Sequence, residues 1–190
     1  MIEIKNLNKI YLKGKKNMVH ALNNINLKID DRETVAIIGE SGAGKSTLLH
    51  IMSCIDNFDG EYYLDNIDIN KLSESKKSKL RSSKIGIVLQ DFALIDDFTV
   101  FENVMTPLYF NKKIKDKKGS VMRALKKTGI VSLKAKKVSQ LSGGQKQRVA
   151  ISRALVTSPE YIFADEPTGS LDSKTSEEIV KMLFDLNRNG

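Results

Sequence analysis

The feature that most constrains this chain is a glycine-rich run at residues 39–46, Gly-Glu-Ser-Gly-Ala-Gly-Lys-Ser. It fits the pattern G-x-x-x-x-G-K-[ST], follows an apolar run at residues 35–38 and precedes a helix-like stretch at residues 47–55. Glycines let the backbone wrap with its N–H groups inward, so that these groups and the next helix N-terminus face phosphate anions. The pattern predicts a nucleotide-binding loop in which Lys45 reaches the β- and γ-phosphates and the Ser46 hydroxyl ligates Mg²⁺.

The composition is that of one globular domain. The 190 residues are 41% hydrophobic and 28% charged, and no apolar run approaches the roughly 20 residues that span a bilayer. The single cysteine, Cys54, excludes an internal disulfide, fits a reducing compartment and is expected to be a buried filler. These observations predict a cytoplasmic location.

The net charge of +8 is concentrated in one stretch of the chain. Residues 111–137 hold eleven Lys or Arg against one acid, Asp116. A solvated helical face is the favoured interpretation, and attraction to an anionic membrane surface or a partner is the alternative. Hardly any aromatic residues lie among these lysines to stack on bases, so the pattern disfavours nucleic-acid binding.

Apolar patterns indicate an α/β fold with two kinds of strand. Residues 2–7 and 25–29 alternate with period two, which predicts an antiparallel sheet with one exposed face. Residues 35–38 and 161–164 are continuous apolar runs, which predict parallel strands buried on both faces of a central sheet. Between them we expect another buried strand at residues 85–89, followed by helices that form a helical lobe, at residues 101–110 and 120–127.

Two consecutive carboxylates, Asp165 and Glu166, follow the apolar run at residues 161–164. The carboxyl ends of the strands are where α/β sheets place their ligands. Because successive strand side chains point to opposite sides, Asp165 is expected to hold Mg²⁺ through water, and Glu166 is free to polarise the attacking water as general base. The alternative is that the pair simply begins a surface loop.

The run Leu-Ser-Gly-Gly-Gln at residues 141–145 resembles, residue for residue, the signature sequence of the ATP-binding cassette superfamily. Ser142, Gly143 and Gly144 open an expected helix that runs through residues 147–156, and the run so presents a second helix N-terminus to an anion. The resemblance covers nearly the whole chain. It implies a single nucleotide-binding domain over residues 1–190, with a P-loop NTPase core, an N-terminal antiparallel β subdomain and an inserted α-helical subdomain at about residues 91–140.

The resemblance also assigns roles to further positions. Gln90 matches the family's glutamine that contacts Mg²⁺ and the lytic water, although in isolation a polar strand cap would be favoured. Tyr11 occupies the place of the aromatic residue that stacks on adenine, with a core tyrosine as the alternative, and Asp172 matches a loop that couples two sites across a dimer. The expected catalytic residues are Glu166, Gln90 and Lys45, and the expected metal ligands are Ser46, Gln90 and Asp165. The expected nucleotide-binding residues are Tyr11, Gly39, Ser41, Gly42, Ala43, Gly44, Lys45, Ser46, Thr47, Ser142, Gly143, Gly144 and Gln145.

One feature of the family pattern is missing. Family members carry a histidine at the end of the strand after the helix that follows Asp172, where it contacts the γ-phosphate. Here the only histidines are His20 and His50, both far ahead of the carboxylate pair, and residues 173–189 read as the preceding helix with Gly190 as its terminator. We therefore expect a chain shortened at its C-terminus, for which ATP binding is supported more firmly than hydrolysis.

The resemblance implies the ATP-binding subunit of a transporter, similar to the macrolide-export, lipoprotein-release and antimicrobial-peptide-resistance subgroup. Such a subunit binds ATP and Mg²⁺, forms a homodimer on ATP binding with each signature over the partner's γ-phosphate, and lies peripherally on the inner face of the cell membrane. It couples ATP hydrolysis to export or membrane extraction through a membrane-spanning permease subunit, without nucleic acid.

Two alternatives remain. One is a nucleotide-binding, non-hydrolysing interaction module. The other is a soluble cassette ATPase of DNA repair or translation. Repair members insert long coiled coils between the phosphate loop and the signature, and translation members fuse two cassettes, but this sequence has neither feature.

Overall fold

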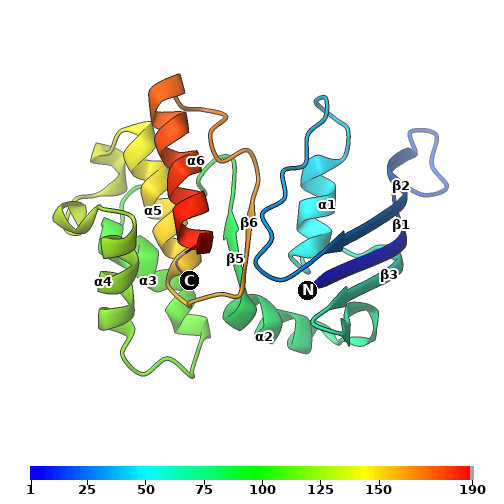
Figure 1. Cartoon of the computed structure of the whole chain (residues 1–190), viewed down its shortest axis with the longest axis horizontal. Helices are drawn as coiled ribbons and strands as arrows, with labels where there is room; N and C mark the ends of the chain where they lie inside the picture. The colour runs from blue at the N-terminus through cyan, green and yellow to red at the C-terminus, as the bar shows by residue number, and fades with distance from the viewer. Residues whose placement is uncertain (189–190) are drawn as a thin grey trace. The chain divides into compact units, whose positions relative to one another are not determined.

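The computed structural model describes residues 1–188 and divides into two compact units, residues 1–78 and the chain from residue 79 onward (Figure 1). The first unit contains β1 (Ile2–Tyr11), β2 (Val19–Ile29), α1 (Lys45–Met52), β3 (Asp59–Leu64), β4 (Ile67–Asp68) and a short 3₁₀ turn, η1 (Ile69–Lys71). Helix α2 (Glu74–Lys84) runs from the first unit into the second. The second unit continues with β5 (Ile85–Val88), α3 (Val100–Phe110), α4 (Lys117–Lys127), η2 (Val131–Leu133), η3 (Val138–Gln140), α5 (Gly143–Leu155), β6 (Tyr161–Ala164) and α6 (Ser173–Arg188).

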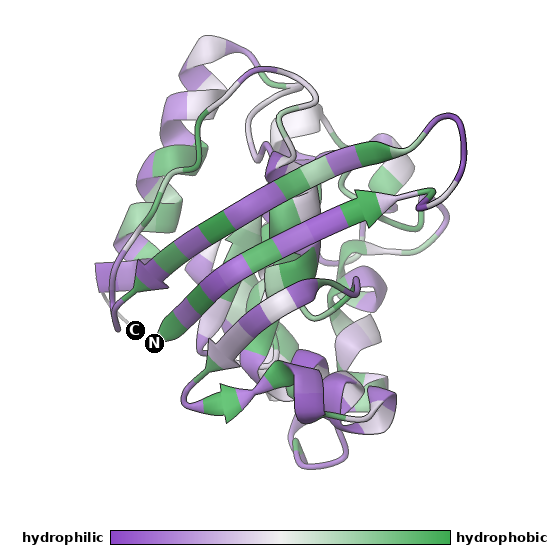
Figure 2. Ribbon diagram, turned by 90° about the vertical axis from the view of Figure 1, so that its right-hand side faces the viewer, coloured by the Kyte–Doolittle hydropathy of each residue, from purple (hydrophilic) through white to green (hydrophobic). Residues whose placement is uncertain are grey.

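The first unit is built on an antiparallel sheet with strand order β2-β1-β3-β4. Figure 2 shows hydrophilic and hydrophobic residues alternating along its two long strands. In β1 the apolar side chains of Ile2 and Ile4 are buried, as the period-two pattern predicts. A register irregularity between Ile4 and Leu7, where Asn6 has a φ of +48°, shifts the phase and buries Leu7 as well. Helix α1 buries Leu48, Leu49, Ile51 and Met52 in the same unit, and Cys54 beyond it is buried as expected.

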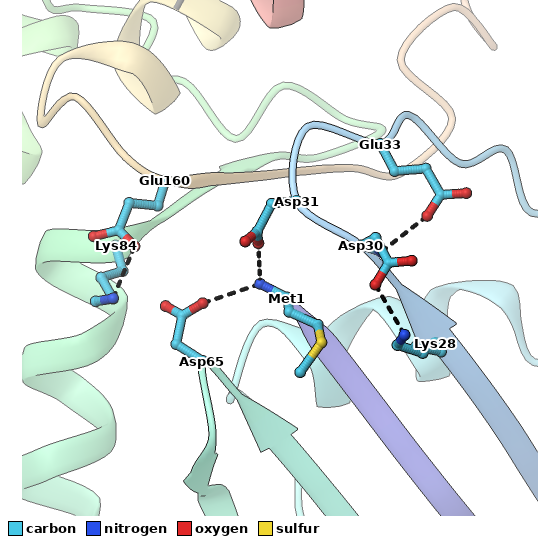
Figure 3. Close-up of polar contacts among 8 residues, drawn as sticks. All are labelled: Met1, Lys28, Asp30, Asp31, Glu33, Asp65, Lys84 and Glu160. Carbon is cyan, nitrogen blue, oxygen red and sulfur yellow. Dashed lines mark hydrogen bonds and ion pairs between the residues drawn. The ribbon is translucent and has the colours of Figure 1, made fainter.

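The chain start is tied to this sheet by charge (Figure 3). The Met1 ammonium group donates to Asp31, just after β2, and to Asp65, just after β3, with the second contact at 3.0 Å. Burial by itself would lower the pKa of the ammonium group, but the hydrogen bonds to Asp31 and Asp65 outweigh burial and raise that pKa. The start of β1 is thereby fixed to the ends of both neighbouring strands, β2 and β3.

The apolar run at residues 35–38 is not a buried strand, contrary to the sequence prediction. It pairs with no strand among residues 1–188, Val35 and Ile37 are each 41% exposed, and Ile38 is 91% exposed. A parallel strand is buried only when neighbouring strands bond its N–H and C=O groups and helices cover both faces. The four strands of the first unit pair with one another and leave this segment outside their sheet.

In the second unit β5 and β6 form a parallel pair in which Ile85 lies opposite Tyr161 and Val88 opposite Ala164. The predicted strands at residues 85–89 and 161–164 are therefore present. Burial on both faces is wrong for β6, because Ile162 is 36% exposed while Phe163 is buried. Ile162 and Phe163 point to opposite faces of the strand, so the face that carries Phe163 is covered and the face that carries Ile162 is partly open. At its start, Lys84 and Glu160 form an ion pair of 2.8 Å (Figure 3).

Helices α3, α4 and α5 pack around one apolar cluster, which confirms the helices expected at residues 101–110 and 120–127. Helix α4 turns Val121, Ala124 and Leu125 inward and exposes Arg123 and its last lysines, as a solvated basic face would. Helix α6 agrees with the prediction to Arg188, and the expected terminator Gly190 lies outside the described residues. None of the helices within residues 1–188 is long and apolar enough to cross a membrane.

Candidate nucleotide site

The glycine-rich run forms a closed loop ahead of α1. Gly42 and Gly44 have φ values of +81° and +87°, a left-handed conformation that glycine adopts without the steric cost of a Cβ atom. The Lys45 ammonium group donates to the carbonyl oxygens of Gly39 and Glu40, both at 2.8 Å. The loop thus curls around its own lysine, with the start of α1 directly behind it.

Gly44 is also required for space. A Cβ atom on this residue would lie 2.3 Å from the Ala21 carbonyl oxygen and 2.9 Å from Leu22 Cδ2. Strand β2 therefore passes immediately behind the loop and sets where α1 begins. Gly42 has no neighbour within 4 Å of the equivalent position, so its requirement is conformational only.

Tyr11 ends β1, opposite Val19, and is 37% exposed, which rules out the core-tyrosine alternative. Its hydroxyl donates to Asp56 at 2.8 Å, and the Lys9 ammonium group lies 4.8 Å from its ring centroid. Burial tends to raise the pKa of Asp56, but hydrogen bonds from Lys9 and Tyr11 outweigh it and lower that pKa. Sequence reasoning missed Lys9 and Asp56, although a lysine two residues before Tyr11 lies on the same strand face.

The carboxyl ends of β5 and β6 bring two predicted catalytic residues together. Gln90 Nε2 donates to Glu166 Oε2 at 2.9 Å, across 76 positions of sequence. The Asp165 N–H donates to the Val88 carbonyl at 2.9 Å, which extends the strand pairing to the residue before Glu166. The hydrogen bond joins Gln90 to Glu166 just beyond the ends of β5 and β6, and the metal and general-base roles of these residues stay predictions.

The signature run starts α5, which begins at Gly143, as the sequence predicts. Ser142 is its N-cap: the Ser142 hydroxyl accepts from the Gln145 N–H, and the Gln145 side chain accepts from the Ser142 N–H at 3.2 Å. A Cβ atom on Gly144 would lie 2.6 Å from Thr175 Cγ2, so the first turns of α5 and α6 approach closely. The glycines of this run allow that approach.

Asp172 precedes α6 and accepts hydrogen bonds from the Thr175 hydroxyl at 2.6 Å and the Thr175 N–H at 3.0 Å. Both hydrogen bonds favour the carboxylate and lower its pKa. Asp172 is therefore the helix cap beside the signature run.

The expected metal ligands are distributed over both units. Ser46 lies in the first turn of α1, in the first unit, and Gln90 and Asp165 lie at the strand ends of the second. Within residues 1–188 no three or more His, Cys, Asp or Glu side chains are clustered so that they could hold a metal ion. The hydroxyl, amide and carboxylate oxygens of the three expected ligands are the hard donors that Mg²⁺ prefers.

Comparison with known proteins gives a consistent result. The family described as ABC transporter matches residues 22–169. The chain is 46% identical over 193 residues to the uncharacterized ABC transporter ATP-binding protein MJ0796 of Methanocaldococcus jannaschii, covering 98% of this chain and 82% of that protein. It is 42% identical over 189 residues to the lipoprotein-releasing system ATP-binding protein LolD of Wigglesworthia glossinidia brevipalpis, with coverages of 98% and 82%.

A macrolide export ATP-binding/permease protein, MacB of Mannheimia succiniciproducens, is 43% identical over 192 residues, which span this whole chain and 30% of that protein. Among solved structures, dimeric MJ0796 superposes with a TM-score of 0.89 at 44% identity, covering 99% of this chain and 83% of that one. A dimeric post-hydrolysis state of MJ0796 bound to ADP and Pi gives 0.88 at 44% identity, with coverages of 98% and 83%.

Proposed function

Because this chain belongs to the ABC transporter family as an ATP-binding cassette, we propose that its phosphate loop, carboxylate pair and signature run bind Mg-ATP at a homodimer interface. The chain is the ATP-binding subunit of an ABC transporter, in the subgroup that contains MacB and LolD, and its family is one of ATP hydrolases. The assignment of site residues, metal, dimer and membrane partner is the proposal.

The observation that carries this proposal is the hydrogen bond between Gln90 and Glu166. It places an amide and a carboxylate together at the carboxyl ends of two parallel strands, where α/β sheets place their ligands. A general base must lie within hydrogen-bond reach of the water that it activates, directly or through one other group. Glu166 has this role in the proposal, and Gln90 orients the same water.

The phosphate loop fits a nucleotide. Gly42 and Gly44 hold left-handed conformations that turn the loop, and α1 starts directly behind it, so backbone N–H groups and the helix dipole are available to phosphate oxygens. Lys45 would exchange its two carbonyl contacts for phosphate oxygens when a nucleotide binds. Ser46, Gln90 and Asp165 would hold Mg²⁺, which would neutralise the charge on the phosphates.

The signature run supplies a second anion site, at the N-terminus of α5. We assign it to the nucleotide held by a second copy of the chain, which the dimeric MJ0796 structures support. The similarity to MacB, an ATP-binding/permease protein, and to LolD, of a lipoprotein-releasing system, supports a membrane-spanning partner and a peripheral position on the inner membrane face. We propose that the complete transporter uses ATP hydrolysis to export its substrate or to extract it from the membrane.

Replacement of Lys45 tests the phosphate loop. We expect Lys45→Ala to weaken Mg-ATP binding about 10- to 100-fold, since hydrogen bonds to charged groups are worth roughly 1.5–3 kcal/mol. Isothermal titration calorimetry measures the affinity. Lys71→Ala is the matched control, because Lys71 is an exposed lysine of the same unit that pairs with Asp68. Unchanged affinity in Lys45→Ala would contradict the loop assignment.

Phosphate release by the purified chain tests the hydrolytic pair. Glu166→Gln and Gln90→Ala are expected to bind Mg-ATP while releasing phosphate far more slowly than wild type. Absence of turnover by wild type, with intact binding, would favour the non-hydrolysing module instead. Salt-dependent binding to DNA or ribosomes would favour the soluble cassette ATPases.

A further inference from the structure

Resting on the proposed function, we propose that Arg153 is a positioning residue for hydrolysis, which fixes the turn after Gln90 and so holds the Gln90 amide against Glu166. Arg153 lies in the last turn of α5, far along the chain from Gln90. None of the sequence motifs includes it.

Arg153 donates a pair of hydrogen bonds to the turn after Gln90. Its Nη2 donates to the Phe92 carbonyl at 2.7 Å, and its Nη1 donates to the Ala93 carbonyl. The planar fork of a guanidinium group suits two adjacent acceptors, whereas an ammonium group is a single point charge. Arg153 therefore grips two consecutive peptide groups, two and three residues after Gln90.

These contacts hold an unusual backbone conformation in the turn. Phe92 and Ala93 have φ values of +61° and +45°, so two consecutive residues with side chains are left-handed. Residues other than glycine rarely adopt this conformation, and it persists only where the surroundings hold it. The Ala93 N–H also donates to the Asp91 carbonyl at 2.7 Å, which tightens the turn.

Arg153 is also partly buried. Burial lowers the pKa of the guanidinium group, and the carboxylate of Asp91 opposes that shift. Hydrogen bonds from a charged donor are stronger than those from a neutral one, and removal of the guanidinium group would leave the Phe92 and Ala93 carbonyls without this donor. The Phe92 side chain meanwhile packs against the apolar cluster of β5, α5 and α6, so the turn is anchored by both its backbone and its side chain.

The consequence concerns the geometry of Gln90. Its Nε2 atom is 2.9 Å from Glu166 Oε2, while its backbone lies between β5 and the turn that Arg153 grips. Strand β5 fixes one side of Gln90, and Arg153 fixes the other. Displacement of the turn would move the amide away from Glu166 without touching the phosphate loop.

The test compares Arg153→Met with Arg148→Met. Arg148 lies on the same helix and also donates to a backbone carbonyl, that of Thr128 at 3.1 Å, and to Glu178 at 2.9 Å, but it does not contact the turn after Gln90. For Arg153→Met we expect kcat for ATP hydrolysis to fall about 10- to 100-fold, as small misplacements of catalytic groups do. We expect KM and the Kd of a fluorescent ATP analogue to stay within about twofold of wild type. Arg148→Met is expected to leave kcat within about twofold.

Arg153→Lys provides the conservative variant. Because a lysine can hold one of the two carbonyls, we expect its kcat to lie between those of wild type and Arg153→Met. If Arg153→Met fails to fold, the kcat of Arg153→Lys against that of Arg148→Lys decides in the same way. An unchanged kcat, or a parallel rise in KM and Kd with no change in kcat, would overturn the proposal.

Hydrogen exchange separates this inference from the proposed function. Faster exchange at residues 91–95 is expected in Arg153→Met and not in Arg148→Met, whether or not the chain hydrolyses ATP. If wild type shows no turnover, the hydrolytic assignment of Gln90 and Glu166 falls and exchange alone tests the grip on the turn. If Gln90→Ala slows turnover while Arg153→Met leaves both kcat and exchange unchanged, the proposed function stands and the role of Arg153 is wrong.

Discussion

At the scale of single residues, two glycines of the phosphate loop share a conformation but differ in their surroundings. Gly42 and Gly44 both have φ near +80°, yet only Gly44 has a neighbouring backbone oxygen, that of Ala21, within 2.3 Å of a Cβ position. The pair therefore separates the cost of a left-handed backbone from the cost of a steric clash.

We expect Gly42→Ala to lower the free energy of unfolding by about 1–2 kcal/mol, the cost of a left-handed alanine. Gly44→Ala is expected to cost more than that, because strand β2 or the start of α1 must also shift. Urea denaturation followed by circular dichroism measures both values. Equal losses in the two variants would show that β2 does not constrain the loop.

At the scale of elements, α3 is started by a capping box. The Thr99 hydroxyl accepts from the Glu102 N–H at 3.2 Å, and the Glu102 carboxylate accepts from the Thr99 N–H at 2.7 Å. We expect Thr99→Ala to lower the free energy of unfolding by about 1 kcal/mol. Thr99→Ser keeps the acceptor and should stay near wild type in the same denaturation experiment. A loss in Thr99→Ser as large as that in Thr99→Ala would assign the effect to the Thr99 methyl group.

The same box predicts a pH dependence. The N–H and hydroxyl of Thr99 donate to Glu102 and lower its pKa in the folded chain, while an unfolded glutamate has a pKa of about 4.3. The stabilisation by the charged form is therefore complete above about pH 4.3 and is lost as the pH falls through the folded pKa. We expect the stability difference between wild type and Glu102→Gln to shrink over that acidic range. A difference that is constant with pH would rule out a role for the charge.

At the scale of the whole molecule, the proposed sites are complete only when two chains meet. With Mg-ATP, Glu166→Gln is expected to form a dimer of twice the 21.2 kDa chain mass, because ATP that is not hydrolysed keeps the two chains together. Size-exclusion chromatography with light scattering measures this mass. The double variant Lys45→Ala, Glu166→Gln should remain monomeric, and a monomeric Glu166→Gln protein in Mg-ATP would contradict the shared site.

Much of the fold could be predicted from the sequence, because the deciding interactions are local. Period-two alternation indicated β1 and β2, and apolar spacing indicated α3 and α4, because in each element the side chains that face the core recur at a fixed interval. The glycine spacing of the phosphate loop indicated its turns, and Ser142 with Gln145 marked the start of α5. In these cases residues a few positions apart determine the backbone.

Contacts between distant residues were decided by the tertiary structure alone. The apolar run at residues 35–38 indicated a buried strand, but burial depends on which strands pair with it, and those of the first unit pair with one another. The Gln90–Glu166 hydrogen bond depends on the register of β5 with β6, and the grip of Arg153 on Phe92 depends on how α5 packs beside that turn. The sequence by itself therefore determined which residues could bind a nucleotide, and only the tertiary structure decided which of them touch, since register and packing join positions that local patterns do not relate.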